Sequence, residues 1–268
     1  MSNDPFLERL DRARRAARGL ATVTTAQKNR APAAIADAIE GAVPEVVAAN
    51  ELDLQRGREG GMAEGLLDRL LLDEGRLRAL AEAVREVIAL PDPVGEVVRG
   101  STLANGIQIS QVRVPFGVVG AIYEARPNVT VDIAALALKS GNGAVLRGGS
   151  AAEQSNRVLV GLIQRAITSA GLDGDAVQTV DEFGREGATR LMRARGYVDV
   201  LIPRGSAGLI STVVQESTVP VIETGSGVVH VFVDASADEE KAAAIVKNAK
   251  THRPSVCNAA ETLLVHRD

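Results

Sequence analysis

The first part of the chain shows the hydrophobic periodicity of a run of amphipathic helices. Apolar side chains recur every three or four positions with charged side chains between them, the pattern of helices that bury one face. Asp4 followed by Pro5 is a typical helix start, because a carboxylate caps free amides and proline stands where no donor is needed. We expect helices at about residues 4–20, 25–40, 44–54, 63–71 and 73–89.

A different pattern follows these helices. Two alternating stretches, Val97 to Leu103 and Ile107 to Val114, flank Asn105-Gly106. Asn-Gly between alternating stretches is the strongest short signal for a tight hairpin turn, so we predict a β-hairpin over residues 94–115. A lone two-stranded hairpin is marginal in water. We therefore expect it to dock on a partner subunit or on a part of the protein that this chain lacks.

From Phe116 onward, short apolar strands alternate with helices. This alternation implies right-handed crossovers and a Rossmann-type α/β fold, with a parallel sheet covered by helices on both faces. The expected strands are residues 117–123, 144–147, 177–180, 198–202 and 219–222, and the expected helices are residues 129–139, 152–170, 184–193 and 207–215.

Polar residues gather where four of these strands end. The segments are Glu124 to Asn128, Arg147 to Ser150, Pro203 to Ser206 and Glu223 to Gly225. Ligands of parallel sheets bind at this edge, and small residues with cations suit a phosphate-bearing ligand. Glycines after strands are also ordinary turn residues. Because the G-x-G-x-x-G fingerprint is absent, the pattern alone leaves the cofactor open.

Composition narrows the class of protein. With 46% hydrophobic, 24% charged and only 2% aromatic residues, the chain has the profile of a soluble α/β protein. A net charge of -4 gives no global field that attracts nucleic acid, and no apolar run is long enough to span a membrane. The single cysteine excludes an internal disulfide, and the three histidines lack metal-ligand spacing. We expect a cytoplasmic protein without a metal, a membrane or a nucleic-acid partner.

The single cysteine, Cys257, is the candidate for chemistry. It is flanked by Arg253, Ser255 and Asn258, and such donors and positive charge make a thiolate available as a nucleophile. The alternative is that it is a small buried apolar residue, as most free cysteines are. It follows an expected strand at 228–234 and helix at 238–250, and precedes a strand-like stretch at 262–266. A new strand so near the last residue indicates that the chain stops inside a second domain.

Longer motifs give these features a family context. The sequence resembles the gamma-glutamyl phosphate reductases, also called glutamate-5-semialdehyde dehydrogenases, of the aldehyde dehydrogenase superfamily. The resemblance runs in order from about residue 6 to the last residue, and its Arg-Pro-Asn and Arg-Pro-Ser-x-Cys-Asn motifs are specific. The matching segments include LLDRLLL (66–72), VRVPFGVVGAIYEARPNVTVD (112–132), LRGGS (146–150), LIPRGSAGLI (201–210), VIETGSG (221–227) and RPSVCNAAETLLVH (253–266).

The resemblance implies an aldehyde-dehydrogenase-like fold. Residues 1–232 would form an NADPH-binding domain, interrupted by an oligomerisation hairpin at 94–115. Residues 233–268 would begin an α/β catalytic domain that the chain leaves unfinished. The implied partners are the small-molecule substrate and further copies of the chain, as a dimer or higher homo-oligomer. Functional coupling to glutamate 5-kinase is a further partner that the resemblance raises.

The implied reaction is the NADPH-dependent reduction of L-glutamate 5-phosphate to L-glutamate 5-semialdehyde and phosphate, in proline biosynthesis. By the family motif, Cys257 is the nucleophile that forms a thioester, and the amide of Asn128 with the backbone N–H of Cys257 binds the oxyanion. The same resemblance offers Arg253, Ser255 and Lys139 as holders of the departing phosphate. For Lys139, an exposed lysine at a helix end is at least as good an interpretation.

The resemblance also assigns cofactor residues. Arg147, Gly148, Gly149 and Ser150 form the turn that would meet the adenosine half, where Arg147 could bind a 2′-phosphate and favour NADPH. Gly205 and Ser206 belong to the segment that would cover the pyrophosphate. Glu223 falls where hydrolytic relatives keep a general base, and a reductase needs no activated water. We therefore expect Glu223 to be near the cofactor or structural.

Two alternatives stay open at this point. The chain could be a cofactor-binding fragment without catalysis, which its unfinished second domain suggests. It could also be an aldehyde dehydrogenase relative with another acyl substrate, although the Arg-Pro-Ser-x-Cys-Asn context argues against this.

Overall fold

The computed structural model describes residues 4–225, 227–254 and 256–267. The N-terminal region is helical, as predicted, and Asp4 caps its first helix by accepting from the Phe6 amide at 3.0 Å. Thr24 and Gln27 form a capping box at the second helix, which runs through Pro32 without a restart. The third helix continues five residues beyond its predicted end, from Leu54 to Glu59. The helices are α1 (Pro5–Leu20), α2 (Thr25–Gly41), α3 (Val43–Glu59), α4 (Glu64–Leu70) and α5 (Glu74–Ala89).

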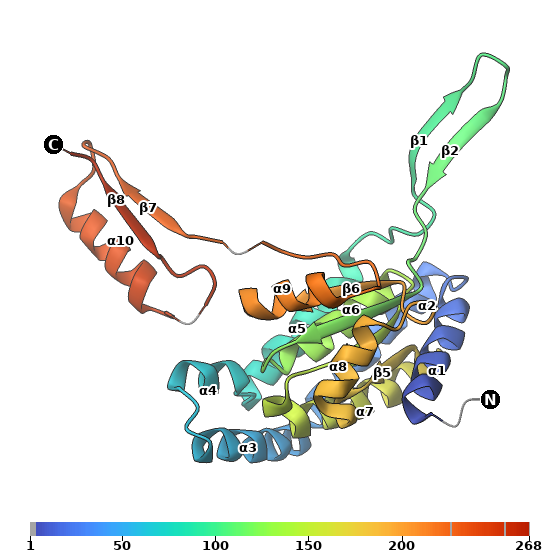
Figure 1. Ribbon diagram of the computed structural model, residues 1–268, viewed down its shortest axis with the longest axis horizontal. Coiled ribbons are helices and arrows are strands. Elements are labelled where there is room, and N and C mark those ends of the chain that lie inside the picture. Colours follow the sequence, from blue (N-terminus) through green and yellow to red (C-terminus); the bar gives the residue numbers. More distant parts are fainter. Residues whose placement is uncertain (1–3, 226, 255, 268) are drawn as a thin grey trace.

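A parallel sheet forms the centre of the molecule (Figure 1). Its strands are β3 (Val118–Tyr123), β4 (Gly143–Arg147), β5 (Val177–Thr179) and β6 (Val200–Arg204), in the spatial order β5-β4-β3-β6. The connecting helices are α6 (Asn128–Lys139), α7 (Glu153–Ser169), α8 (Gly184–Met192) and α9 (Ala207–Glu216), with short 3₁₀ turns at Ser150–Ala152, Gly174–Ala176 and Asp181–Phe183. The α/β prediction is confirmed.

Helices cover both faces of this sheet. Successive strand residues point to opposite faces, and the apolar residues on each face pack into a core. Ala121, Tyr123 and Leu146 pack into one core with α2, α5, α6 and α7. Val118 and Val145 face a second core, with α1, α8 and the helix that follows β6. Residues 4–93 and 116–225, which contain these cores, are called the body below.

One predicted strand does not form. Residues 219–222 contribute only an isolated bridge, between Leu201 and Val221. The Leu201 amide donates to Pro220 at 2.8 Å and the Ile222 amide donates to Leu201 at 2.9 Å. Pro220 has no N–H to extend the ladder, so the pairing ends after these bonds.

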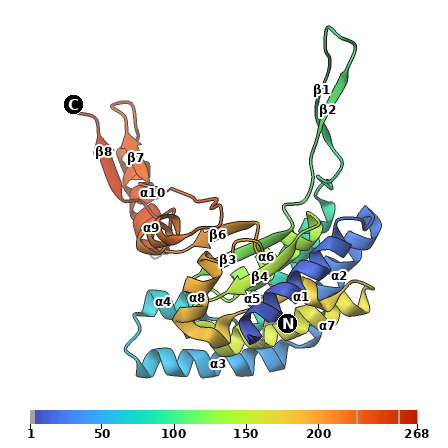
Figure 2. The same cartoon turned by 45° about the vertical axis from the view of Figure 1, so that its right-hand side comes forward.

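The predicted hairpin is present as β1 (Val97–Thr102) and β2 (Gln108–Val112), paired antiparallel. It projects away from the body as a separate ribbon in both views (Figures 1 and 2). Every residue of the two strands is exposed.

The last elements are β7 (His230–Val233), α10 (Glu239–Thr251) and β8 (Thr262–Val265). The strands pair in parallel with α10 as the crossover, and we call the described residues of 230–267 the C-terminal arm. The arm stands out from the body in both views (Figures 1 and 2). Its helix has no buried residue, and Phe232 is 59% exposed. Within the described ranges, no helix has the length and apolar character needed to cross a membrane.

Candidate active site

The order of the strands determines where a ligand is expected. The chain passes from β3 to β4 and β5 on one side, and then returns to place β6 on the other side of β3. The crevice of a parallel sheet lies at such a reversal, outside the carboxyl ends of the strands. Here these ends are Glu124 and Arg204, joined by a bond of 3.2 Å from the Glu124 amide to the Arg204 carbonyl.

A cleft of about 380 Å³ opens at this point between the body and the arm. The body contributes side chains from α4, from the loop after β3 and from the turn after β6, and the arm contributes the loop between α10 and β8. The lining residues from the arm are Pro254, Val256, Cys257 and Glu261.

Cys257 is exposed and faces this cleft. The alternative that its thiol is buried is therefore wrong. Its loop is fixed to α10 by a bond of 2.9 Å from the Ala260 amide to Ala249 and by a bond of 2.8 Å from Lys250 Nζ to the Ala260 carbonyl. The arm thus presents the sulfur at the carboxyl edge of the body's sheet.

Glu124 holds the turn after β6 against the end of β3. Ser206 Oγ donates to one carboxylate oxygen of Glu124 at 2.6 Å, and the Ser206 amide donates to the other at 3.1 Å. Gly205 is so close that a β-carbon there would lie 2.8 Å from Glu124 Cδ. Ser206 also caps α9, by accepting from the Leu209 amide at 3.3 Å. The N-terminus of α9 is therefore fixed at the cleft.

The turn from Arg147 to Ser150 lines neither cleft and packs against the loop after β3. A β-carbon on Gly149 would lie 3.1 Å from the Ala125 amide nitrogen, so the two loops approach backbone to backbone. The Gly148 amide donates to Asp181 at 2.6 Å, and Arg147 Nη1 donates to the Gly148 carbonyl at 2.6 Å. Burial raises the pKa of Asp181, and the Gly148 bond opposes this shift.

A buried chain of hydrogen bonds ties this turn to the start of α6. The Tyr123 hydroxyl bonds to Thr130 Oγ1 at 2.6 Å, and Thr130 donates to Asn156 Oδ1 at 2.8 Å. Asn156 Nδ2 then donates to Asp181 at 3.2 Å. Polar groups linked in this way restrict one another's positions, so the two loops are held in a fixed relation.

A second cleft of about 430 Å³ adjoins the first and shares Arg69, Arg126 and Val256 with it. Asn128 lines this second cleft and donates from Nδ2 to Asp132 at 3.1 Å. An amide nitrogen carries two hydrogens, so one donor of Asn128 stays available. Burial raises the pKa of Asp132, and the Asn128 bond opposes this shift.

Arg253 also lines the second cleft, where Arg253 Nη2 lies 2.8 Å from a carboxylate oxygen of Asp68 on α4. Asp68 is shared with Arg76, whose Nη2 lies 2.5 Å from its other oxygen. These bonds from Arg76 and Arg253 lower the pKa of Asp68. Ser255 lies outside the described residues.

Comparisons with known proteins identify the family of the chain. The aldehyde dehydrogenase family model matches residues 7–268. The chain belongs to the aldehyde dehydrogenase family. It is 63% identical over 260 residues to the gamma-glutamyl phosphate reductase of Leifsonia xyli subsp. xyli, covering 97% of this chain and 62% of that protein. It is 64% identical over 263 residues to the one of Clavibacter michiganensis subsp. michiganensis, covering 98% of this chain and 61% of that protein.

Solved structures show the same relationship. The crystal structure of gamma-glutamyl phosphate reductase from Thermotoga maritima superposes with a TM-score of 0.88 at 45% identity, covering 98% of this chain and 64% of that one. The Saccharomyces cerevisiae structure of the same name gives a TM-score of 0.76 at 30% identity, covering 98% of this chain and 66% of that one. The chain thus spans just over 60% of the length of the Leifsonia and Clavibacter relatives.

Two candidate site residues from the sequence, Lys139 and Glu223, line neither cleft. Lys139 is only 3% exposed, so the exposed helix-end interpretation is wrong. Its Nζ donates to Asn29 at 2.5 Å and to the Ile88 carbonyl at 2.9 Å. It ends the helix that Asn128 begins, roughly 16 Å away along the axis, so the structure gives no support to a role beside Cys257. Glu223 is exposed on the segment that leads to the arm.

Sequence reasoning places Arg253 beside the thiol but does not bring Arg69, Arg126 and Arg204 to it. Arg126 and Arg204 belong to the strand-end segments that suit a phosphate-bearing ligand, whereas the leucine-rich segment 66–72 by itself gives Arg69 no role. A lone arginine in an apolar run is the signal that could have identified it. Leu66 belongs to the same segment, is 45% exposed and lines the cleft.

Proposed function

We propose that this chain carries the cofactor-binding part and the nucleophile of an NADPH-dependent gamma-glutamyl phosphate reductase. Such an enzyme reduces L-glutamate 5-phosphate to L-glutamate 5-semialdehyde and releases phosphate. The relatives that carry this name support the proposal through their identity over nearly the whole chain. The observation that carries it is the exposed Cys257 in the cleft at the β3–β6 reversal.

The chemistry assigned to Cys257 is an acyl transfer. Its thiolate attacks the acyl carbon of the acyl phosphate, a carbon–sulfur bond forms, and the carbon–oxygen bond to phosphate breaks with its electron pair leaving on phosphate. The second amide hydrogen of Asn128 and the backbone N–H of Cys257 are the proposed donors to the oxyanion of the tetrahedral stage. Removing one such donor typically slows turnover by about two to three powers of ten.

The residues at the carboxyl edge of the sheet fit NADPH. Gly205 and Ser206 place the N-terminus of α9 at the cleft, where the Ser206 amide donates to Glu124 and the amides of Ala207 and Gly208 remain to favour an anion. Arg147 lies at the end of β4, and its guanidinium has donors left besides the one bound to the Gly148 carbonyl, which suits contact with a 2′-phosphate. Ser150 is exposed beside it, and Glu223 is retained as cofactor-proximal or structural. When bound, NADPH would supply the hydride that reduces the thioester.

The domain arrangement is proposed on the same basis. Residues 1–232 would form the NADPH-binding domain, interrupted by the hairpin at 94–115, and residues 233–268 would begin the catalytic domain. The exposed hairpin, with Val97 60% and Ile107 54% exposed, suits docking in a homo-oligomer. We place the reaction in the cytoplasm, because a catalytic thiol needs a reducing compartment.

The direct test is phosphate-dependent oxidation of L-glutamate 5-semialdehyde with NADP, followed by NADPH absorbance. Cys257→Ser should lower the rate by about three powers of ten or more, because a serine hydroxyl is far from ionised at neutral pH. Ser236→Ala, an exposed substitution on the same arm, should leave the rate unchanged. Activity retained in Cys257→Ser would refute the nucleophile assignment.

A cofactor-binding fragment without turnover is the second candidate. It is favoured by the share of its relatives that the chain covers and by the absence of buried residues on α10. Fluorescence titration with NADPH separates the two, since the fragment binds the cofactor but gives no turnover in the same assay. Comparing the semialdehyde with other small aldehydes tests a different acyl substrate.

A further inference from the structure

Arg69 and Arg126 form the wall between the two clefts. Both side chains line the cleft that contains Cys257 and the neighbouring cleft that contains Asn128. A ligand held by these two arginines would therefore lie between the proposed nucleophile and the proposed oxyanion donor.

The Nε of Arg69 is enclosed and has no hydrogen-bond partner among the residues that the structure describes. Among the described residues, it is the only buried side-chain nitrogen or oxygen atom without a hydrogen-bond partner. A buried donor on a charged group is strongly unfavourable when it lacks an acceptor. Because this Nε is enclosed, a ligand would be bound by the Nη groups of Arg69, which form no ion pair with a described residue.

Arg126 also lacks an ion pair within the described part of the chain. Burial lowers its pKa, and repulsion from Arg69, Arg204 and Arg253 lowers it further. Neither carboxylate that lines the cleft pairs with Arg69 or Arg126, and the three arginines of its lining outnumber these two carboxylates. Glu124 is bound to Ser206, and Glu261 forms no salt bridge with a described residue. The cluster is therefore poised for an anion.

Arg253 is less suited to this task, although the sequence resemblance favoured it. Its guanidinium is bound to Asp68, so part of its hydrogen-bonding capacity is already used. Arginine forks match phosphate oxygens in pairs, and two unpaired guanidinium groups provide enough donors for a phosphate dianion.

We infer that Arg69 and Arg126 together seat the phosphate group of the acyl phosphate beside Cys257, and hold it as it leaves. This inference rests on the proposed function and adds the residues that select an acyl phosphate over other acyl donors. As the carbon–sulfur bond forms and the carbon–oxygen bond breaks, negative charge grows on the departing phosphate. The paired guanidinium groups stabilise that charge where it develops.

Alkylation of Cys257 by iodoacetamide tests this phosphate-binding site without requiring turnover. The chain has one cysteine, so the label is unambiguous, and the reagent is neutral, so its own approach does not depend on the arginines. Inorganic phosphate should slow labelling by occupying the space next to the sulfur. Arg69→Met and Arg126→Met should each raise the phosphate concentration needed for half protection by about tenfold or more, as expected for a lost charged hydrogen bond.

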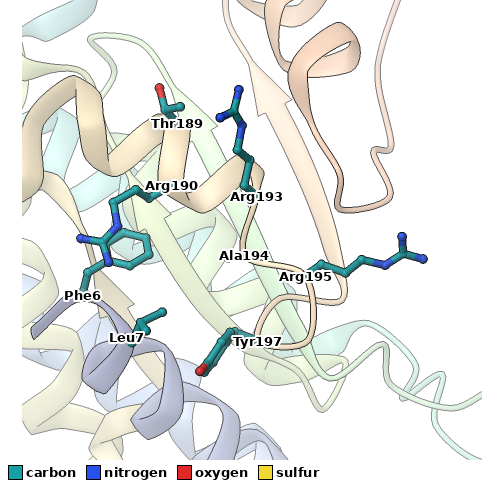
Figure 3. Close-up of a pocket in the computed structure, with 8 residues that line it drawn as sticks. All are labelled: Phe6, Leu7, Thr189, Arg190, Arg193, Ala194, Arg195 and Tyr197. Atoms are coloured by element: carbon teal, nitrogen blue, oxygen red, sulfur yellow. The ribbon is translucent and has the colours of Figure 1, made fainter. Parts of the chain in front are cut away.

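Arg193→Met is the matched control. Arg193 lines a separate cleft of about 290 Å³ beside Phe6, and its side chain extends away from the phenyl ring (Figure 3). Protection by phosphate should be unchanged in this variant. Arg69→Lys and Arg126→Lys keep the charge but lose the fork, so they should give intermediate values and serve where a methionine variant fails to fold. Equal protection in all variants, no protection of the unmodified chain, or equal protection by chloride at the same ionic strength would each overturn the inference.

The phosphate KM of semialdehyde oxidation gives a second readout. The two arginine variants should raise this KM by about tenfold, with a smaller change in the KM for NADP. Normal turnover with an unchanged phosphate KM in the arginine variants would reject the phosphate-binding site but leave the proposed function intact. Phosphate protection without turnover in the unmodified chain would reject the proposed function instead.

Discussion

Strand β4 of the body and strand β8 of the arm are both short and apolar, but their surroundings differ. Val145 and Leu146 of β4 are fully buried between two helical layers. Leu264 and Val265 of β8 are 48% and 64% exposed, and β8 pairs only with β7 among the described strands. The same kind of sequence is therefore enclosed in one region and largely open in the other.

This difference matters because the proposed site takes its groups from both regions. Cys257 belongs to the arm, whereas Arg69, Arg126 and Ser206 belong to the body. The body's groups are held by a packed sheet and by hydrogen bonds such as those of Glu124. The position of the sulfur depends on how firmly the arm is docked, so differences in stability between the two regions are directly relevant to function.

Hydrogen exchange should show the largest contrast. Amides of β3 and β4 should exchange only through global unfolding, and amides of β7, α10 and β8 should exchange faster by about three powers of ten or more. The reason is the absence of buried residues on α10 and the exposure of β8. Residue-resolved exchange measured by NMR checks this. Equal protection in both regions would show that they unfold as one unit.

Matched truncations in the two regions should differ in their effect on the free energy of unfolding. Leu146→Ala removes a fully buried side chain from β4 and should lower it by about 2–5 kcal/mol. Leu264→Ala removes a side chain that is 48% exposed on β8 and should change it by no more than about 0.5 kcal/mol. Urea unfolding of both variants measures the difference. A large loss in Leu264→Ala would show that the arm is part of the main core.

Much of the body and the whole hairpin could be predicted from the sequence, because their signals are local. Helical periodicity, the Asp4 cap and the Asn105-Gly106 turn each specify structure within a few residues. Residues 219–222 failed as a strand because Pro220, which cannot donate to the ladder, weakens an otherwise apolar signal.

The site was predictable only where one segment carried the signal. The exposed Cys257 and the turn at Gly205-Ser206 were expected from their motifs, and the structure places both in one cleft. The burial of Lys139 depends on Asn29 and Ile88, which are distant in sequence. Arg69 joins the cleft through the tertiary docking of α4, which no local pattern reveals.

The two regions should also differ in the sign of a pH effect. Burial raises the pKa of Asp181 in the body, so the folded state holds this proton more tightly than the unfolded chain. The wild-type free energy of unfolding, relative to Asp181→Asn, should therefore fall as pH rises from about 4, by at most about 1.4 kcal/mol per pH unit. Urea unfolding of both proteins between about pH 4 and 7 tests this, and a difference that grows with pH would contradict it.

Asp234 on the arm is the matched contrast. Hydrogen bonds from Ser236 lower the pKa of Asp234, so its contribution to stability is present above its unfolded pKa of about 3.9 and is lost as the pH falls through the lowered value. Carboxyl NMR titration should place Asp181 above this reference value and Asp234 below it. The same direction of shift for both would show that the two regions provide similar environments.

The smallest expected effect concerns the ion pair that joins the regions. Arg253 and Asp68 are 49% and 40% exposed, so breaking the pair with Arg253→Met should weaken docking of the arm by only about 0.2–1 kcal/mol. Cys257 should then react with iodoacetamide faster, but by less than about fivefold. Arg76→Met removes the other partner of Asp68 from within the body and should leave the labelling rate unchanged. An acceleration well beyond fivefold would mean that this single pair holds the sulfur in place, and that the contact between the two regions is weaker than the shared cleft suggests.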